Sequence, residues 1–195
     1  MNILNKEYDK ILFVHIPKTA GSSISKILDD NNLDNWKREY PRHHDPYFYL
    51  KNNNKIDEKV FSFSVVRNPY TRTYSCYKQF NKANKTDISF MTYLNNILEK
   101  KISKNTPLLH LPQSFYIVGE ADKIQVTKFY KFENLKELEN DLSWKIGSYN
   151  VGDYTKDMYR DAYTNIAIDI VEKLYACDFL AFGYDMDFNA TLETK

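Results

Sequence analysis

The fold of this chain is decided at Phe13–Ser23, which reads FVHIPKTAGSS. An apolar run over residues 11–16, interrupted only by His15, predicts a short buried strand. The strand ends at Pro17, and a loop of small residues leads into a helical pattern that begins near Ser22. Backbone N–H groups and the positive end of a helix dipole converge at such a junction, which predicts a site for a phosphate-like anion.

The loop also carries one cation and several small hydrogen-bonding side chains that suit an anion. Lys18 supplies a full positive charge. Hydroxyl groups of little bulk come from Thr19, Ser22 and Ser23. Two common nucleotide motifs are excluded, because no Gly-Lys-Ser/Thr occurs in the chain and Gly21 alone does not make a Rossmann fingerprint. An ordinary strand-to-helix turn with Ser22 as the N-cap stays an open alternative.

A second strand-to-helix junction follows within residues 60–80. Val60–Val66 alternates apolar and small polar residues and predicts a strand, and Pro69 is well placed to begin a helix. Arg67 therefore stands at the carboxyl end of a strand, and Ser75 lies about two turns into the helix. A guanidinium and a hydroxyl so arranged predict a second oxyanion site, with a structural salt bridge of Arg67 as an equally open interpretation.

The two junctions together resemble the 5'- and 3'-phosphate motifs of sulfotransferases that use 3'-phosphoadenosine 5'-phosphosulfate (PAPS). The resemblance is nearest to the carbohydrate sulfotransferases related to heparan sulfate 2-O-sulfotransferases and their small bacterial relatives. It rests on His15–Ser23 and Val66–Tyr77, with weaker similarity at Phe132–Leu135 and Tyr154–Tyr184. It implies a three-layer, P-loop-like α/β fold in which helices flank a central parallel sheet.

The resemblance also implies roles for the residues of both motifs. Lys18 is expected to stabilise charge on the leaving phosphate oxygen while a sulfuryl group moves to an acceptor hydroxyl. The 3'-phosphate would be held by Arg67 and Ser75. The residues expected around the 5'-phosphate are Pro17, Lys18, Thr19, Ala20, Gly21, Ser22 and Ser23. Nothing in this chemistry requires a metal.

The acceptor hydroxyl must lose its proton to a base, and the resemblance points to residues 42–46, which read RHHDP. Alignment with the family motif puts His44 in the catalytic position and His43 beside it. The alignment could shift by one residue, so either histidine could be the base. An imidazole with an ordinary pKa of about 6.5 suits this work near neutrality. A solvated polar loop is the open alternative. His15 is expected to pack at the strand end, and His110 to be partly buried and hydrogen-bonded.

The remaining patterns alternate strands with helices, as expected for a parallel sheet. A strand is predicted over residues 126–132, and a last strand at Phe182–Tyr184 is implied by the resemblance. Further helices are predicted over residues 22–30, 89–101, 134–142 and 158–175. No repeat or low-complexity linker interrupts the chain, so we expect a single sulfotransferase domain over residues 1–195.

Composition agrees with one compact enzyme. The 195 residues are 43% hydrophobic and 15% aromatic, which is enough to bury a substantial core. The net charge of +1 gives no support to nucleic-acid binding, and no nucleic-acid partner is expected. Cys76 and Cys177 are too few for a disulfide framework and are expected to be free thiols.

The sequence offers no signal-peptide core and no stretch of about 18 continuous apolar residues. Golgi members of the family carry a membrane anchor, so we expect either a cytoplasmic microbial enzyme or a chain that lacks its anchor. The short, polar lead-in at residues 1–10 favours the cytoplasmic enzyme.

The prediction is therefore a PAPS-dependent sulfotransferase of EC 2.8.2 type. Its acceptor is expected to be a hydroxyl-bearing saccharide or polysaccharide. Two alternatives remain on the same fold: a nucleotide-dependent kinase, which the position of Lys18 disfavours, and a non-catalytic module that binds a nucleotide or a glycan.

Overall fold

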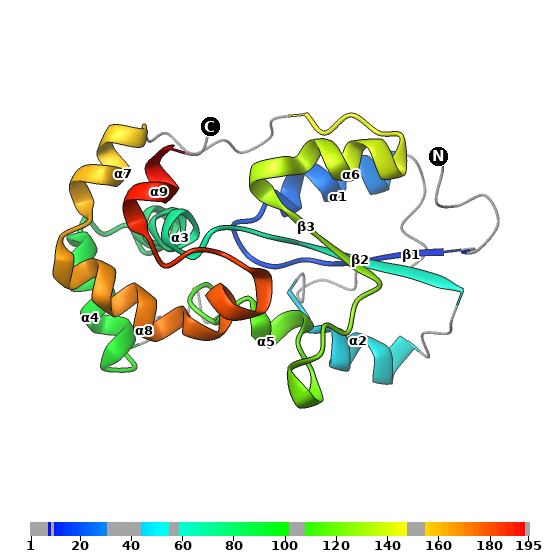
Figure 1. The fold of residues 1–195 in the computed structure, drawn as a ribbon, viewed down its shortest axis with the longest axis horizontal. Coiled ribbons are helices and arrows are strands. Elements are labelled where there is room, and N and C mark those ends of the chain that lie inside the picture. The colour runs from blue at the N-terminus through cyan, green and yellow to red at the C-terminus, as the bar shows by residue number, and fades with distance from the viewer. Residues whose placement is uncertain are drawn as a thin grey trace. The chain divides into compact units, whose positions relative to one another are not determined.

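The described residues form a parallel sheet of three strands (Figure 1). β1 (Lys10–Val14), β2 (Val60–Val66) and β3 (Lys128–Lys131) lie in the order β1-β2-β3, and Phe13 pairs with Phe63. This confirms the predicted α/β class with a parallel sheet. The structure is a computed structural model, and it describes residues 8, 10–30, 44–54, 59–101, 108–147 and 155–193.

The central strand, β2, is buried along its whole length because both faces of the sheet are covered. One face packs its large side chains against α1 (Gly21–Asp30) and α6 (Leu135–Leu142). Figure 1 shows α2 (Tyr47–Asn54) and α5 (Ser114–Ile117) on the opposite side of the sheet. The arrangement is the three-layer order of helices, sheet and helices that the sequence predicts.

The serines that alternate with apolar residues in β2 all face buried surroundings and need partners there. Ser64 Oγ donates a hydrogen bond to the Val14 carbonyl at 2.7 Å. Ser62 Oγ accepts one from the Thr127 N–H at 2.9 Å, just before β3 begins. Both serines therefore connect β2 to a neighbouring segment of the sheet.

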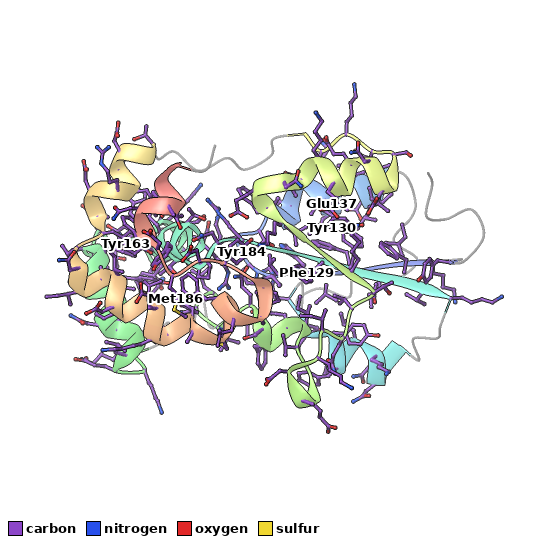
Figure 2. The ribbon with its side chains drawn as sticks, in the orientation of Figure 1. Phe129, Tyr130, Glu137, Tyr163, Tyr184 and Met186 are labelled. Atoms are coloured by element: carbon purple, nitrogen blue, oxygen red, sulfur yellow. The ribbon has the colours of Figure 1, made fainter. Side chains whose placement is uncertain are left out.

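Charged groups fix α6 beside β3, where Figure 2 labels Tyr130 and Glu137. Lys128 Nζ lies 2.8 Å from a Glu137 carboxylate oxygen and 2.6 Å from one of Asp141. The Tyr130 hydroxyl donates to the same oxygen of Asp141 at 2.8 Å. The hydrogen bond from Lys128 lowers the pKa of Asp141, so this carboxylate stays ionised and keeps both contacts at neutral pH.

Two compact units make up the chain. The sheet unit consists of Met1–Val66 and Gln113–Val151, and the helical unit consists of Arg67–Pro112 and Gly152–Lys195. Two short turns of 3-10 helix, η2 (Glu120–Asp122) and η3 (Phe132–Asn134), also belong to the sheet unit. The helical unit holds α3 (Pro69–Asn84), α4 (Phe90–Leu98), α7 (Lys156–Ala162), α8 (Asn165–Phe182) and α9 (Phe188–Glu193).

An aromatic core holds the helical unit together. The Tyr70 ring packs edge-to-face against Phe179 and Tyr163, with centroids 5.0 and 5.7 Å apart. The Tyr163 hydroxyl donates to the Tyr70 carbonyl at 2.9 Å, and the Tyr70 hydroxyl donates to a Glu172 carboxylate oxygen at 2.6 Å. Figure 2 labels Tyr163 among the crowded side chains of this unit. Tyrosine is suited to this buried core because its ring packs against other rings while its hydroxyl donates a hydrogen bond to an acceptor.

The C-terminal segment differs from its prediction in two places. The helix predicted over residues 158–175 is two helices, because buried Tyr163 ends α7 and Thr164 caps α8 by accepting from the Ala167 N–H at 3.2 Å. The strand expected at Phe182–Tyr184 is wrong. α8 continues to Phe182, and Gly183 ends it with a left-handed φ of 60°.

The other predicted elements are confirmed to within a few residues, namely α1, α4, α6 and β3. A search for membrane-crossing segments within the described ranges found no helix of sufficient length and apolarity.

His110 is the least expected feature of the helical unit. It is only 6% exposed, and within the described part of the chain neither ring nitrogen has a hydrogen-bond partner. The expectation of a hydrogen-bonded His110 is therefore wrong. Burial, with a smaller contribution from the nearby Arg72 guanidinium, lowers the pKa of this imidazole below its usual range.

The lowered pKa of His110 predicts loss of stability in acid. The unfolded chain takes up this proton near pH 6.5 and the folded chain resists it, so the contribution is complete above that pH and falls as pH drops below it. We expect His110→Leu to flatten the fall in unfolding free energy between pH 8 and pH 5, by at most about 1.4 kcal/mol per pH unit. Urea unfolding at several pH values measures this. All other titrating groups are common to both proteins, and parallel curves would contradict the assignment.

Candidate functional site

The loop between β1 and α1 has an unusual backbone. Lys18 and Ala20 adopt left-handed φ values of 69° and 67°, which cost about 1–2 kcal/mol for each residue with a side chain. Thr19 lies between them, fully buried, and its Oγ1 donates to the Ile16 carbonyl at 2.9 Å. The Ala20 carbonyl accepts from the Ser23 N–H at 3.0 Å. These bonds hold the loop in a tight, strained turn of the kind found at functional sites.

This turn leads directly into α1. The helix begins at Gly21, one residue before the N-cap that the sequence predicts at Ser22. Ser22 is exposed in the first turn, whereas Ser23 is buried. Lys18 is half-buried and Pro17 is buried at the entry to the loop. A helix N-terminus with a lysine in the preceding loop has the electrostatics of an anion site.

The imidazole of His15 occupies the position that a β-carbon would take at Gly21. A methyl group built on Gly21 would overlap the His15 ring. The ring also stacks on Phe13, with centroids 5.5 Å apart and an angle of 20° between planes. His15 thus packs at the strand end, as expected, and fixes how closely α1 approaches it.

The structure brings His44 to the same place. Its Nδ1 lies 2.9 Å from the His15 carbonyl oxygen, and the two imidazole rings are 4.3 Å apart. A carbonyl can only accept, so Nδ1 is the donor in this bond, and in the neutral imidazole Nε2 then carries the lone pair. Sequence reasoning predicts His44 near the loop but does not predict that His15 holds it. His43, the other candidate base, lies outside the described residues.

The second motif lies in the helical unit. Asn68 caps α3 by accepting from the Tyr70 N–H at 3.0 Å, and Pro69 is the first helical residue, as predicted. Arg67 is half-buried, and its Nε donates to Thr71 Oγ1 at 3.0 Å. Thr71 Oγ1 in turn donates to the Asn68 carbonyl at 3.1 Å. Thr71, which the sequence interpretation missed, stands four residues after Arg67 and so lies one helical turn away.

Ser75, the partner predicted for Arg67, is buried on α3 with 4% of its surface exposed. The two junctions belong to different units, Lys18 and His44 to the sheet unit and Arg67 and Ser75 to the helical unit. Within the described ranges, no three His, Cys, Asp or Glu side chains gather closely enough to hold a metal ion. The donors present at both motifs are nitrogen and hydroxyl groups, which suit oxyanions.

The close approach of His15 to Gly21 predicts a rescue experiment. Gly21→Ala forces the imidazole off Phe13 and His44, and we expect a loss of about 1–3 kcal/mol in urea unfolding. His15→Ala in the Gly21→Ala chain removes the overlap and restores part of that loss. Ser22→Ala, at the exposed neighbouring position, is the control and should change stability by less than about 0.5 kcal/mol. Strictly additive effects of the two substitutions would contradict the overlap.

Comparison with known proteins agrees with this geometry. Searches of curated proteins and of solved structures gave no match. The family model described as "Sulfotransferase family" matches residues 1–144 of the 195. The match covers both phosphate-type junctions and His44, and it extends over well more than half of the sequence. The chain belongs to the sulfotransferase family.

Proposed function

We propose that this protein transfers a sulfuryl group from PAPS to a hydroxyl group of a carbohydrate. Sulfuryl transfer in general follows from the family. The observation that carries the finer proposal is the hydrogen bond from His44 Nδ1 to the His15 carbonyl, because it holds an imidazole beside the loop that would bind the donor. Transfer to a hydroxyl needs both a held donor and a proton acceptor.

In this proposal the loop and the start of α1 hold the 5' end of the donor. The acceptor oxygen attacks sulfur, a new S–O bond forms, and the bond from sulfur to the bridging phosphate oxygen breaks. Lys18 stabilises the negative charge that the leaving phosphate gains. Thr19, whose hydroxyl already donates to Ile16, would contribute only its backbone N–H, while Ser22 is exposed and offers its hydroxyl.

Arg67 and Ser75 would hold the 3'-phosphate, the group that distinguishes this donor from ATP. The bond from Arg67 Nε to Thr71 supports this role because it restrains the plane of the guanidinium. A planar fork of donors suits the tetrahedral oxygens of a phosphate. The bond from Thr71 to the Asn68 carbonyl extends that restraint to the cap of α3.

His44 would accept the proton of the acceptor hydroxyl at Nε2. As the ring becomes cationic, the His15 carbonyl stabilises the charge through the Nδ1–H bond, which strengthens when the donor is ionised. His43 remains the alternative base in this proposal.

The donor assignment predicts a preference for a 3'-phosphate. We expect 3'-phosphoadenosine 5'-phosphate to bind more tightly than 5'-AMP or ATP in isothermal titration. Arg67→Ala should weaken binding of the bisphosphate by about tenfold to a hundredfold and leave 5'-AMP unaffected. Arg160→Ala removes an exposed arginine of the same unit and is the matched control. Equal affinity for ATP and the bisphosphate would favour the kinase.

The catalytic assignment predicts different losses at two residues. Lys18→Ala should lower turnover by ~10²–10³, and His44→Ala by ~10²–10⁴ with affinity for the bisphosphate retained. The assay follows radiolabelled sulfuryl transfer from PAPS to saccharides extracted from the source organism. His43→Ala is the neighbouring control, and a larger loss there would move the base to His43. Full activity of both Lys18→Ala and His44→Ala would overturn the mechanism.

A further inference from the structure

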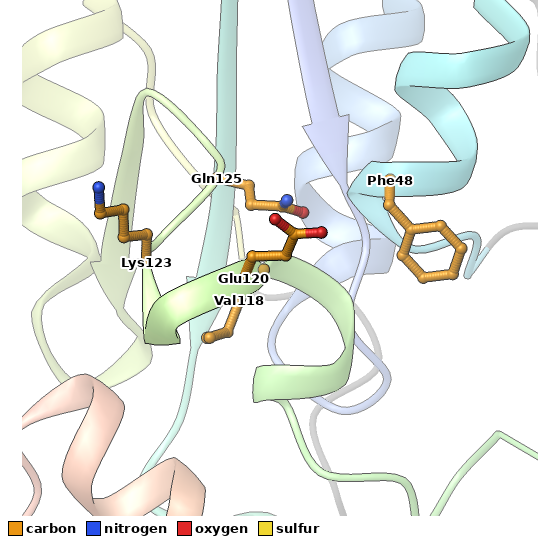
Figure 3. A pocket seen from close by; sticks show the side chains of 6 residues that line it. Phe48, Val118, Glu120, Lys123 and Gln125 are labelled. Atoms are coloured by element: carbon orange, nitrogen blue, oxygen red, sulfur yellow. The ribbon is translucent and has the colours of Figure 1, made fainter.

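A hollow of about 450 Å³ opens on the sheet unit, beside α2 (Figure 3). Its volume lies in the range of small-molecule sites, which is roughly 300–1,000 Å³. One wall is Phe48, on the first turn of α2. The opposite wall is the turn of residues 118–125, which contributes Val118, Gly119, Glu120, Lys123 and Gln125.

The turn of residues 118–125 is a built structure with a fixed shape. The Gly119 N–H donates to the Lys123 carbonyl at 2.9 Å, and the Gln125 N–H donates to the Ile117 carbonyl at 2.8 Å. The Gln125 side chain packs so closely on Gly119 that a β-carbon there would overlap it. A side chain at position 119 would therefore displace the Gln125 amide, which is part of the wall of the hollow.

On the other side of the hollow, the Phe48 ring packs against Phe115, which lies outside the lining. Phe48 is 47% exposed and Phe115, on α5, is 43% exposed, although both are large and apolar. Their centroids are 6.3 Å apart with an angle of 88° between the rings, an edge-to-face pair that leaves ring surface open to solvent. An exposed aromatic ring beside a few polar side chains is typical of a ligand site.

The polar groups of the hollow suit a neutral, hydroxyl-rich ligand. Figure 3 shows the side chains of Glu120 and Gln125 extending from the turn toward the side where Phe48 lies. A carboxylate accepts from ligand hydroxyls, and an amide both accepts and donates. Glu120 and Lys123 are the two charged residues of the lining, so their formal charges cancel. A polyanion would meet the Glu120 carboxylate and gain little net attraction.

We infer that this hollow binds a sugar ring of a neutral saccharide and is a subsite for the acceptor. The inference rests on the proposed function and narrows its acceptor class from carbohydrates in general to uncharged ones. The ring would stack on Phe48 while its hydroxyls bond to Glu120 and Gln125. Phe48 follows His44 by four residues, at the first turn of α2, so the subsite and the proposed base belong to one continuous segment of the sheet unit.

The test is saccharide binding by saturation-transfer NMR and isothermal titration. The probes are cellohexaose, mannohexaose and chitohexaose, which are neutral, and hexagalacturonate, which is anionic. We expect a neutral hexasaccharide to bind in the millimolar range or better. Phe48→Ala should weaken it by about threefold to tenfold, and Glu120→Gln by about tenfold. An anionic ligand would instead gain affinity in Glu120→Gln, because a like charge is removed.

Two variants serve as matched controls. Leu98→Ala removes a side chain of similar exposure, 49%, from α4, and Asp122→Asn removes a charge from the same turn outside the lining. Neither should change saccharide affinity. The inference is overturned if none of the four probes binds, if hexagalacturonate binds best, or if Phe48→Ala and Glu120→Gln bind as wild type does.

The same titrations separate this inference from the proposed function. Saccharide binding without affinity for 3'-phosphoadenosine 5'-phosphate would leave the subsite standing and remove the transfer reaction. Nucleotide binding and transfer that Phe48→Ala leaves intact would support the reaction and place its acceptor elsewhere.

Discussion

The close approach of the His15 imidazole to Gly21 is the contact on which the first junction depends. A side chain at position 21 would displace the His15 ring, which also contacts the ring of His44. The strained backbone at Lys18 and Ala20 is held by the buried hydroxyl of Thr19 and by the first bonds of the helix. The shape of the loop, the start of α1 and the position of His15 thus depend on one another. Hydrogen bonds within this arrangement offset the backbone strain of the loop.

His15 has two functions in this arrangement that use different atoms. Its side chain fills the space above Gly21, and its backbone carbonyl accepts from His44. The second function does not depend on the identity of the side chain. An imidazole is nonetheless suited to the position, because a flat ring fits between Phe13 and the glycine.

Much of the fold could be predicted from local patterns. The alternation in β2, the proline at the start of α3 and the helical periodicity of α4 and α6 are local signals, and all are confirmed. The break between α7 and α8 could not be predicted this way. It depends on burial of Tyr163 against Tyr70, a residue more than ninety positions earlier, and long-range packing overrides periodicity there. The same limit applies to His110, because tertiary packing decides whether its ring nitrogens have hydrogen-bond partners, and among the described residues they have none.

The candidate site was predictable in its residue types but not in its supporting contacts. Lys18 and Arg67 can be predicted from the sequence because each is a cation that follows a predicted strand. The contacts of Thr71 with Arg67 and of the His15 carbonyl with His44 are known only from the folded structure. The hollow beside α2 has no sequence signal at all, because its walls come from segments about seventy residues apart.

The cap of α3 has a consequence for the last helix of the chain. Asn68 accepts from Tyr70 with its side-chain oxygen and donates to Thr191 of α9 with its side-chain nitrogen, at 3.0 Å in each bond. One amide therefore joins the residue next to Arg67 to the last described helix. Substitutions that loosen α9 are therefore expected to loosen the backbone beside Arg67 as well. Variation in α9 is thus a means of changing how firmly the Arg67 guanidinium is held.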